Sequence, residues 1–314
     1  MKHSTLGSLA ALAAIWAASP MAQAQSVPGD APAEGAVQPA TPVPNAPHVL
    51  PKEKSWRFGV GLGYGQRTNP LIQSEDIPIV VDLDIAWFGE RWFFDNFDLG
   101  FSLVDNARFT TNVVARLNSD RAFFGKTNTR YVNFSITAGG AQVPISGPPS
   151  APGVPGAGAG NVVPAELEVP DRDYAVELGL EMLLDGEWGQ ATLRAFHDVS
   201  GTHEGYELSA DYSYRWVRGR FSIAPSVGVA WKSAALSDYY WGVHADEVLP
   251  TLQGYQVDAG LGWEAGLRAS YYFTKSMRFA LSANYERLQH SVAMSPIVAE
   301  PEVIGYFAGL AWQF

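Results

Sequence analysis

The sequence contains no cysteine, has fewer basic than acidic residues and, after its first residues, has no long apolar run. Without cysteine there can be no disulfide framework, no thiolate metal site and no lipid-modified cysteine anchor. The formal net charge of -11 argues against nucleic acid as a partner. Because no later stretch of about 20 apolar residues exists, helical membrane spans are not expected. A mean hydropathy of -0.04 suits a chain in which apolar and polar residues alternate.

The first 24 residues have the features of a signal peptide. Lys2 precedes a small, apolar run over 6–18, and the sequence Ala-Gln-Ala at 22–24 is a cleavage pattern. The run is too short to cross a bilayer as a helix, and the alternative interpretation is an uncleaved N-terminal anchor. Cleavage near Ala24 predicts an exported protein.

The mature chain is expected to have two parts. Residues 25–54 are rich in proline and alanine and show no hydrophobic periodicity. Such a segment cannot bury a core, so we expect a periplasmic tether. The composition changes at the start of 55–314, where alternation begins, and this region is the predicted barrel domain.

From residue 55 onward, large apolar residues recur with the period of two that is typical of β-strands. The C-terminal segment is the clearest case, because Ile304, Tyr306, Leu310, Trp312 and Phe314 share one parity and the chain stops on the aromatic residue. Each apolar run is long enough to cross a bilayer when tilted. Twelve strands are predicted, at 56–65, 79–88, 92–103, 109–118, 131–138, 174–184, 190–199, 206–216, 221–232, 257–273, 278–288 and 304–314.

Alternation alone does not separate a soluble β-sandwich from a membrane barrel, but the loop lengths do. Tight connections alternate with long ones, as expected for barrels with short periplasmic turns and long outer loops. The connection at 119–130 is longer than this rule predicts for the periplasmic rim. The fold class predicted is all-β: a transmembrane antiparallel up-and-down β-barrel of about 12 strands in the cell outer membrane. An even number of strands places both the first and the last residue of the barrel domain on the periplasmic side.

Aromatic residues support this orientation. Indole pairs an apolar body with one N–H donor and therefore prefers the membrane interface. The tryptophans expected at the rim with short turns are Trp56, Trp87, Trp92, Trp188, Trp216 and Trp312. The terminal strand supplies the residues expected to act as the signal for the barrel-assembly machinery: Tyr306, Leu310, Trp312 and Phe314.

The opposite face of the strands carries charge, which a membrane barrel would place in its lumen. Charges of mixed sign most simply pair across neighbouring strands and fill the interior. A permeation path and a hydrolase centre are the alternatives. The predicted lumen charges are Asp82, Asp84, Glu177, Glu181, Arg194, Asp211, Arg215, Glu264, Arg268, Arg278 and Glu286.

Two motifs resemble ligand sites but lack the required context. Glycines over 59–65 form a glycine-rich pattern inside a strand, and no helix follows to hold a phosphate. His197-Asp198 and His203-Glu204 flank a hairpin and could form a metal site or an acid–base pair, but no third ligand can be assigned. We therefore expect no cofactor, no metal and no catalytic residues.

Several motifs together resemble the MipA/OmpV family of outer-membrane proteins. They are D-V-S-G-T-H-E-G at 198–205, P-S-V-G-V-A-W at 225–231, D-Y-Y-W-G-V at 238–243, S-P-I-V at 295–298 and the terminal G-L-A-W-Q-F. The resemblance extends over 56–314, and the proline-rich N-terminus and the Gly/Pro-rich loop at 139–173 depart from it. It implies a non-enzymatic barrel that scaffolds a murein lytic transglycosylase and a penicillin-binding protein. Other members imply a porin-like channel for small solutes or antibiotics, or a surface adhesin.

Overall fold

The computed structural model describes residues 55–106, 108–124, 132–134, 169–248 and 252–314. The predicted signal peptide and tether, and most of the Gly/Pro-rich loop, lie outside the described residues. The strands are β1 (Ser55–Arg67), β2 (Ile77–Phe88), β3 (Trp92–Asp95), β4 (Asp98–Asp105), β5 (Phe109–Leu117), β6 (Val132–Phe134), β7 (Val176–Gly186), β8 (Gly189–Asp198), β9 (Tyr206–Ser213), β10 (Trp216–Arg218), β11 (Phe221–Lys232), β12 (Gly260–Tyr272), β13 (Met277–Arg287) and β14 (Glu302–Gln313).

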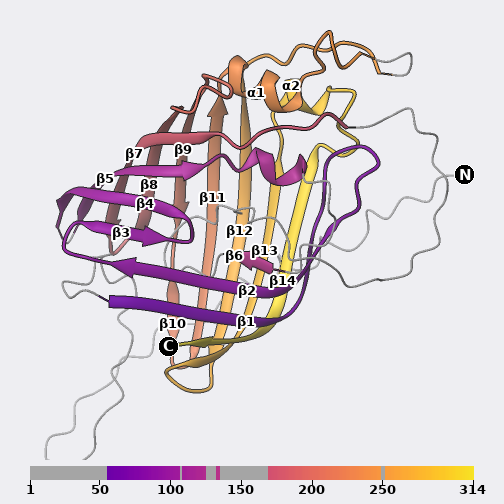
Figure 1. The fold of residues 1–314 in the computed structure, drawn as a ribbon. Helices are drawn as coiled ribbons and strands as arrows, with labels where there is room; N and C mark the ends of the chain where they lie inside the picture. The colour runs from indigo at the N-terminus through magenta and orange to yellow at the C-terminus, as the bar shows by residue number, and fades with distance from the viewer. Residues whose placement is uncertain (1–54, 107, 125–131, 135–168, 249–251) are drawn as a thin grey trace, which may run out of the picture. The chain divides into compact units, whose positions relative to one another are not determined.

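Three short helical segments complete the described fold. They are the 3-10 helix η1 (Asp120–Phe124) and the α-helices α1 (Ala234–Trp241) and α2 (His290–Ala293). None of the helices in the described ranges is long and apolar enough to cross a membrane. Figure 1 shows α1 and α2 near each other at one end of the strands, opposite the end where the C-terminus lies.

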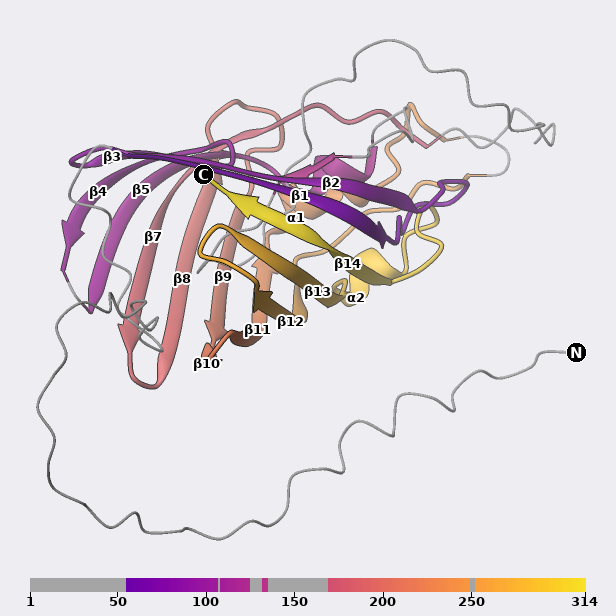
Figure 2. The same cartoon turned by 90° about the horizontal axis from the view of Figure 1, so that it is seen from below.

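The strands close into a barrel. The hydrogen-bonded order is β1-β14-β13-β12-β11-β9-β8-β7-β5-β4-β3-β2, and β2 pairs again with β1, which makes a closed ring of twelve antiparallel strands. Figure 2, a view from below, shows the strands curving around the interior. Closure leaves no unpaired edge to face lipid, where no water could satisfy the backbone groups. The predicted twelve-stranded barrel is confirmed.

Two strand assignments differ from the sequence prediction. One predicted strand is two strands of the ring and another is not part of the ring, so the number of ring strands remains twelve. The segment 92–103 is a hairpin of β3 and β4, because Asn96 and Phe97 adopt positive φ angles of 47° and 80° and reverse the chain. Of the segment 131–138 the structure describes only β6, which pairs in parallel with β2 and is not one of the twelve strands of the ring. The described part of the connection at 119–130, η1, follows the outer end of β5, so this connection does not have to be a short periplasmic turn.

Apolar side chains face outward and charged side chains face inward. On β1, for example, Trp56, Phe58, Leu62 and Tyr64 are exposed, while the glycines at 59 and 61 are buried. The same alternation places Asp82 and Asp84 of β2 in the interior, at 5% and 3% exposure. A soluble protein would bury the first set and expose the second, so this distribution is that of a barrel in lipid.

Candidate functional site: the outer plug and the charged lumen

A small hydrophobic core, which we call the plug, lies at the outer mouth of the barrel. It is built from loops between β1 and β2, β5 and β7, β11 and β12, and β13 and β14, and it includes η1, α1 and α2. Its buried members are Leu71, Phe123, Phe124, Leu236, Tyr240, Trp241, Val243, Leu252, Val257, Leu288, Val292, Ile297 and Val303. The burial of these apolar side chains against one another holds the loops together above the lumen.

The D-Y-Y-W-G-V motif supplies the centre of the plug. Ser233 caps α1, since its side chain accepts a hydrogen bond from the backbone N–H of Leu236. The helix then directs Tyr240 and Trp241 inward, where both are almost fully buried at 0% and 1% exposure. Trp241 packs against Phe124 at a ring distance of 5.4 Å in an edge-to-face arrangement. The sequence alone left the direction of these aromatic residues open.

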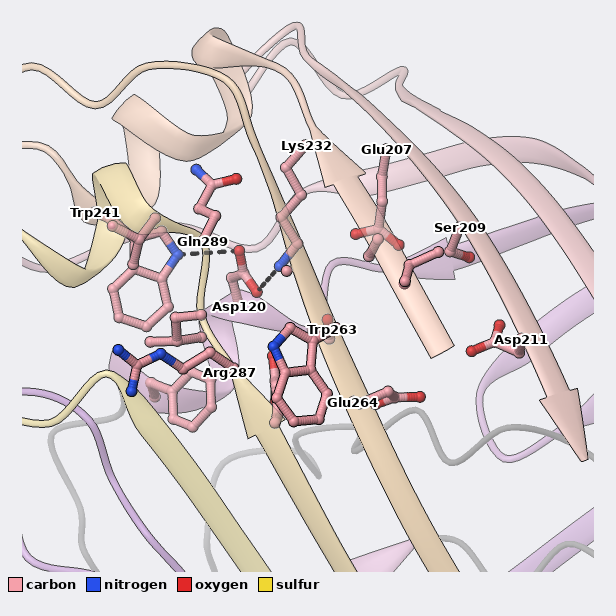
Figure 3. Close-up of a pocket in the computed structure, with 18 of the residues that line it drawn as sticks. Asp120, Glu207, Ser209, Asp211, Lys232, Trp241, Trp263, Glu264, Arg287 and Gln289 are labelled. Atoms are coloured by element: carbon pink, nitrogen blue, oxygen red, sulfur yellow. Dashed lines mark hydrogen bonds and ion pairs between the residues drawn. The ribbon is translucent and has the colours of Figure 1, made fainter. Parts of the chain in front are cut away.

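Polar contacts tie the plug to the barrel wall. The indole Nε1 of Trp241 donates to Asp120 of η1 at 3.1 Å, and Lys232 Nζ of β11 donates to the other oxygen of Asp120 at 2.6 Å. Figure 3 shows these two interactions, with Gln289 beside them. A buried carboxylate is tolerated here because both of its oxygens are satisfied, one of them by a cation.

Arg172 fastens the C-terminal end of α1. Its Nη2 donates to Gly242 O at 2.9 Å and its Nε donates to Tyr240 O at 3.3 Å, so it satisfies carbonyls that the helix leaves unpaired. It also pairs with Glu247 through Nη1 and, at 3.1 Å, through Nη2. Partial burial would raise the pKa of Glu247, but the hydrogen bonds from Arg172 and from the backbone of His244 outweigh it and lower the pKa.

The hairpin with the two predicted His–acid pairs is a structural loop. Asp198 accepts hydrogen bonds from the backbone N–H groups of Ser200, His203 and Glu204, at 2.8, 2.6 and 2.9 Å. His203 Nδ1 accepts from the N–H of Gly205 at 2.9 Å. Both side chains therefore hold the turn. Among the described residues, no group of three or more His, Asp or Glu side chains is arranged to hold a metal ion.

Below the plug, ion-pair networks join inward-facing side chains of different strands along the barrel wall. In the first, Arg116 of β5 lies 2.8 Å from Glu177 of β7 and 2.8 Å from Glu207 of β9, and its guanidinium stacks over the Phe196 ring at 3.7 Å. Asn118 donates to the second oxygen of Glu177 at 2.6 Å. These charges are buried, so each depends on its partners for the solvation that water would otherwise supply.

The second network lies on neighbouring strands. Arg194 of β8 lies 2.9 Å from Glu181 and 2.6 Å from Asp211. Asn112 donates to Glu181 at 3.1 Å. A third group forms where Arg57 of β1 contacts Asp84 at 3.1 Å. The side chains thus pair between strands, as the sequence predicts for a filled interior.

The predicted lumen charges differ in their burial, their partners and their position in the barrel. Glu264 and Glu286 face each other across β12 and β13, and Glu286 lies 3.7 Å from Arg67. Asp82, Asp84, Glu177 and Arg278 are buried. Arg215 lies between β9 and β10, beyond the strand in which it was expected. Arg268 and Asn284 line the lower of two adjoining lumen cavities, and Arg67, Asp211, Glu264 and Glu286 line both.

Important residues that the sequence analysis did not single out include Arg116, Glu207, Asp120 and Lys232. Arg116, Glu207 and Lys232 occupy inward positions of their strands, so strand parity could have identified them. Asp120 follows β5 in a loop, and no periodic signal marks it.

The predicted rim tryptophans lie at the end of the barrel with tight turns. Trp56 and Trp87 are register partners at a ring distance of 6.4 Å. Trp92, Trp188 and Trp216 are exposed at 53%, 51% and 44%. Trp312 pairs with Val60 and Met277 near the end of β14. Tyr306 of β14 and Phe314, which directly follows it, are exposed, and Leu310 lies opposite Leu62.

Known proteins with similar sequences are outer-membrane proteins. Putative outer membrane protein YiaT of Escherichia coli K12 is 24% identical over 48% of this chain and 61% of its own length. OmpV of Vibrio cholerae is 26% identical over 40% of this chain and 49% of its own. The MltA-interacting protein of E. coli K12 is 26% identical over 46% of this chain and 58% of its own. In each case the aligned region thus spans less than two thirds of the relative's own length.

Solved barrels show a distant likeness. OmpT of V. cholerae is 8% identical, covers 85% of this chain and 100% of its own, and gives a TM-score of 0.32. A FadL homologue of Pseudomonas aeruginosa is 7% identical, covers 82% and 87%, and gives a TM-score of 0.33. Residues 58–314 match the family described as MltA-interacting protein MipA. The protein is therefore an outer-membrane β-barrel that belongs to the MipA family.

Proposed function

We propose that this barrel is a non-enzymatic scaffold that holds peptidoglycan-remodelling enzymes at the outer membrane. The partners proposed are a murein lytic transglycosylase and a penicillin-binding protein. The contact surface would be the periplasmic rim together with the tether at 25–54, after removal of the signal peptide at 1–24. One relative is named for an interaction with MltA, and this proposal extends that type of interaction to the present chain.

The hydrophobic core at the outer mouth is the observation that carries the proposal. The plug places buried aromatic residues such as Tyr240 and Trp241 at the outer mouth, and ion pairs centred on Arg116 and Arg194 line the wall of the lumen below. A barrel whose mouth is occupied in this way is poorly suited to passive diffusion. Its remaining accessible surfaces are its rims and loops, which are suited to binding other proteins.

Mild crosslinking in intact cells followed by affinity purification in detergent tests the proposal. We expect the full-length protein to recover a lytic transglycosylase and a penicillin-binding protein. A variant that lacks residues 25–51 should recover less of both while its barrel still folds. Recovery of no murein enzyme, together with no effect of the deletion, would contradict the scaffold.

A gated channel is the second candidate, because two cavities adjoin along the lumen beneath the plug. In this case the plug would open to connect the cavities with the exterior. Planar-bilayer recordings test this function directly, with Trp241→Ala as the variant expected to open more readily. Absence of conductance at any voltage in both proteins would exclude a channel.

A further inference from the structure

One sector of the periplasmic rim has a charge opposite to that of the protein as a whole. The segments 212–232 and 265–285 contain no aspartate and no glutamate, although the chain carries a net charge of -11. The first segment contains the turn between β9 and β11, and the second contains the turn between β12 and β13. We call Arg218, Arg220 and Lys275, the exposed bases of these two turns, the basic sector.

The two turns lie next to each other on the rim. β11 pairs with β12 along its whole length, and β12 pairs with β13. Tyr272 N–H donates to Arg220 O at 2.9 Å, which ties the first turn directly to the second hairpin. Figure 1 shows β10 and the β12–β13 turn at the same end of the barrel as the C-terminus. The three bases therefore lie on two adjacent turns of the same rim.

Strand register sets the direction in which Arg218 points. Within β10, Trp216 lies opposite Ile223 and Arg218 lies opposite Phe221. Residues of one parity share a face of the sheet. Because Ile223 and Phe221 are outward-facing and exposed, Arg218 faces lipid rather than the lumen.

Aromatic residues mark the membrane boundary just above the basic sector. The ring of Tyr271 lies 4.8 Å from that of Phe221 and 5.2 Å from that of Phe273, and Trp216 is exposed beside them. Such aromatic clusters sit at the level of lipid headgroups. Arg218 and Arg220 precede Phe221 by three residues and by one, and Lys275 is two residues after Phe273. The bases thus lie at the depth of the phosphate groups.

The rest of the periplasmic rim lacks this character. Arg91 is next to Glu90, Arg108 is close to Asp105, and the β7–β8 turn carries Glu187. In the basic sector, by contrast, no acid belongs to either turn. Arg218, Arg220 and Lys275 form no ion pair with any residue in the described part of the chain.

We propose that the basic sector binds the phosphodiester headgroups of anionic phospholipids in the periplasmic leaflet of the outer membrane. Guanidinium and ammonium groups attract such headgroups by charge, and guanidinium can also bind phosphate with two parallel hydrogen bonds. An acidic protein that approached from the periplasm could reach Lys275. Arg218, however, shares its face with Trp216 and Phe221, so a lipid headgroup is the ligand that can contact all three bases.

Native mass spectrometry of the barrel with an equimolar mixture of phosphatidylglycerol and phosphatidylethanolamine tests the proposal. We expect the full-chain protein to retain phosphatidylglycerol preferentially. In the Arg218→Gln/Lys275→Gln variant this preference should fall by roughly ten-fold, since each base near an anionic surface strengthens binding. Raising the salt concentration should weaken the preference in the original protein, because these charges are exposed to solvent.

The Arg91→Gln/Arg108→Gln variant is the matched control. It removes the same charge from exposed positions of the same rim, in turns that contain or adjoin acids. We expect it to keep the preference, and both variants should show the same heat-modifiable migration as the original protein. An equal loss in both variants would mean that only net charge matters and would overturn the proposal. An unchanged preference in the first variant, or none in the original protein, would also overturn it.

Discussion

Lys232 and Asp120 join the wall of the barrel to its plug. Lys232 Nζ of β11 lies 2.6 Å from Asp120 Oδ1 of η1, and the other oxygen of Asp120 accepts the indole N–H of Trp241. One carboxylate thus links a membrane strand, a loop that follows β5 and the end of α1. Three segments that are distant in sequence are fixed by one side chain.

Removing this carboxylate should destabilise the barrel substantially. In Asp120→Ala, the ammonium of Lys232 would remain largely buried without its partner, and breaking a buried pair typically costs about 3–5 kcal/mol. Urea unfolding of the protein in detergent micelles, followed by tryptophan fluorescence, measures the change. The exposed pair of Arg287 and Glu302 provides the control, since Glu302→Gln should cost about 1 kcal/mol or less. Equal losses in both variants would contradict the role assigned to Asp120.

The plug depends on the packing of Trp241. Truncation in Trp241→Ala leaves a cavity among Phe123, Phe124 and neighbouring residues and should cost about 3–5 kcal/mol of local stability. We expect the outer loops to become sensitive to protease added to intact cells. Trp188→Ala removes an exposed rim indole instead and should leave these loops resistant. Resistance of the Trp241 variant would show that other contacts suffice to hold the plug.

Barrel closure depends on a close approach of β1 and β14. A Cβ atom on Gly63 would lie only 2.6 Å from the Cα of Gly309, which is backbone and cannot move aside cheaply. Gly63→Ala should therefore weaken the closing seam and reduce the fraction of protein with the heat-modifiable migration of a folded barrel. Gly254→Ala, where the nearest atom would lie at 3.4 Å, is the control and should fold normally. Normal folding of both variants would show that the seam can adjust.

Acid should loosen the end of α1 through Glu247. Its pKa is lowered in the folded protein from the ordinary value of 4.5, so its contribution to stability is fully present above that value. The contribution is lost as the pH falls through the lower folded pKa. Hydrogen exchange of residues 242–247 should therefore show less protection at pH 3 than at pH 7, relative to β12. Glu247→Gln should show the reduced protection at both pH values, and a pH response like that of the original protein would contradict this assignment.

Strand faces were predictable from the sequence because the period of two determines them directly. Trp56, Phe58, Leu62 and Tyr64 face outward as their parity requires, and the ring contains the expected twelve strands. The β3–β4 hairpin was missed because its turn uses Asn96 and Phe97. Only the first of these residues is a common turn former, and an aromatic residue at positive φ gives no recognisable signal.

The plug was not predictable for a different reason. Tyr240 and Trp241 lie in a short helix whose direction is set by contacts from other loops, such as those from Phe124 and Arg172. Such contacts join positions that are far apart in sequence, and periodicity carries no information about them. The inward charges were predictable as a class, but their pairing depended on the register between strands.

The origin of the plug in four separate loops has a consequence for biogenesis. Leu71 comes from the loop after the first strand of the ring and Val303 from its last strand, and both belong to the same buried cluster. The pairing of β14 with β1 brings these residues together. The plug is thus complete only in the closed barrel. In a partly assembled barrel its loops would be exposed to the proteases that degrade misfolded proteins.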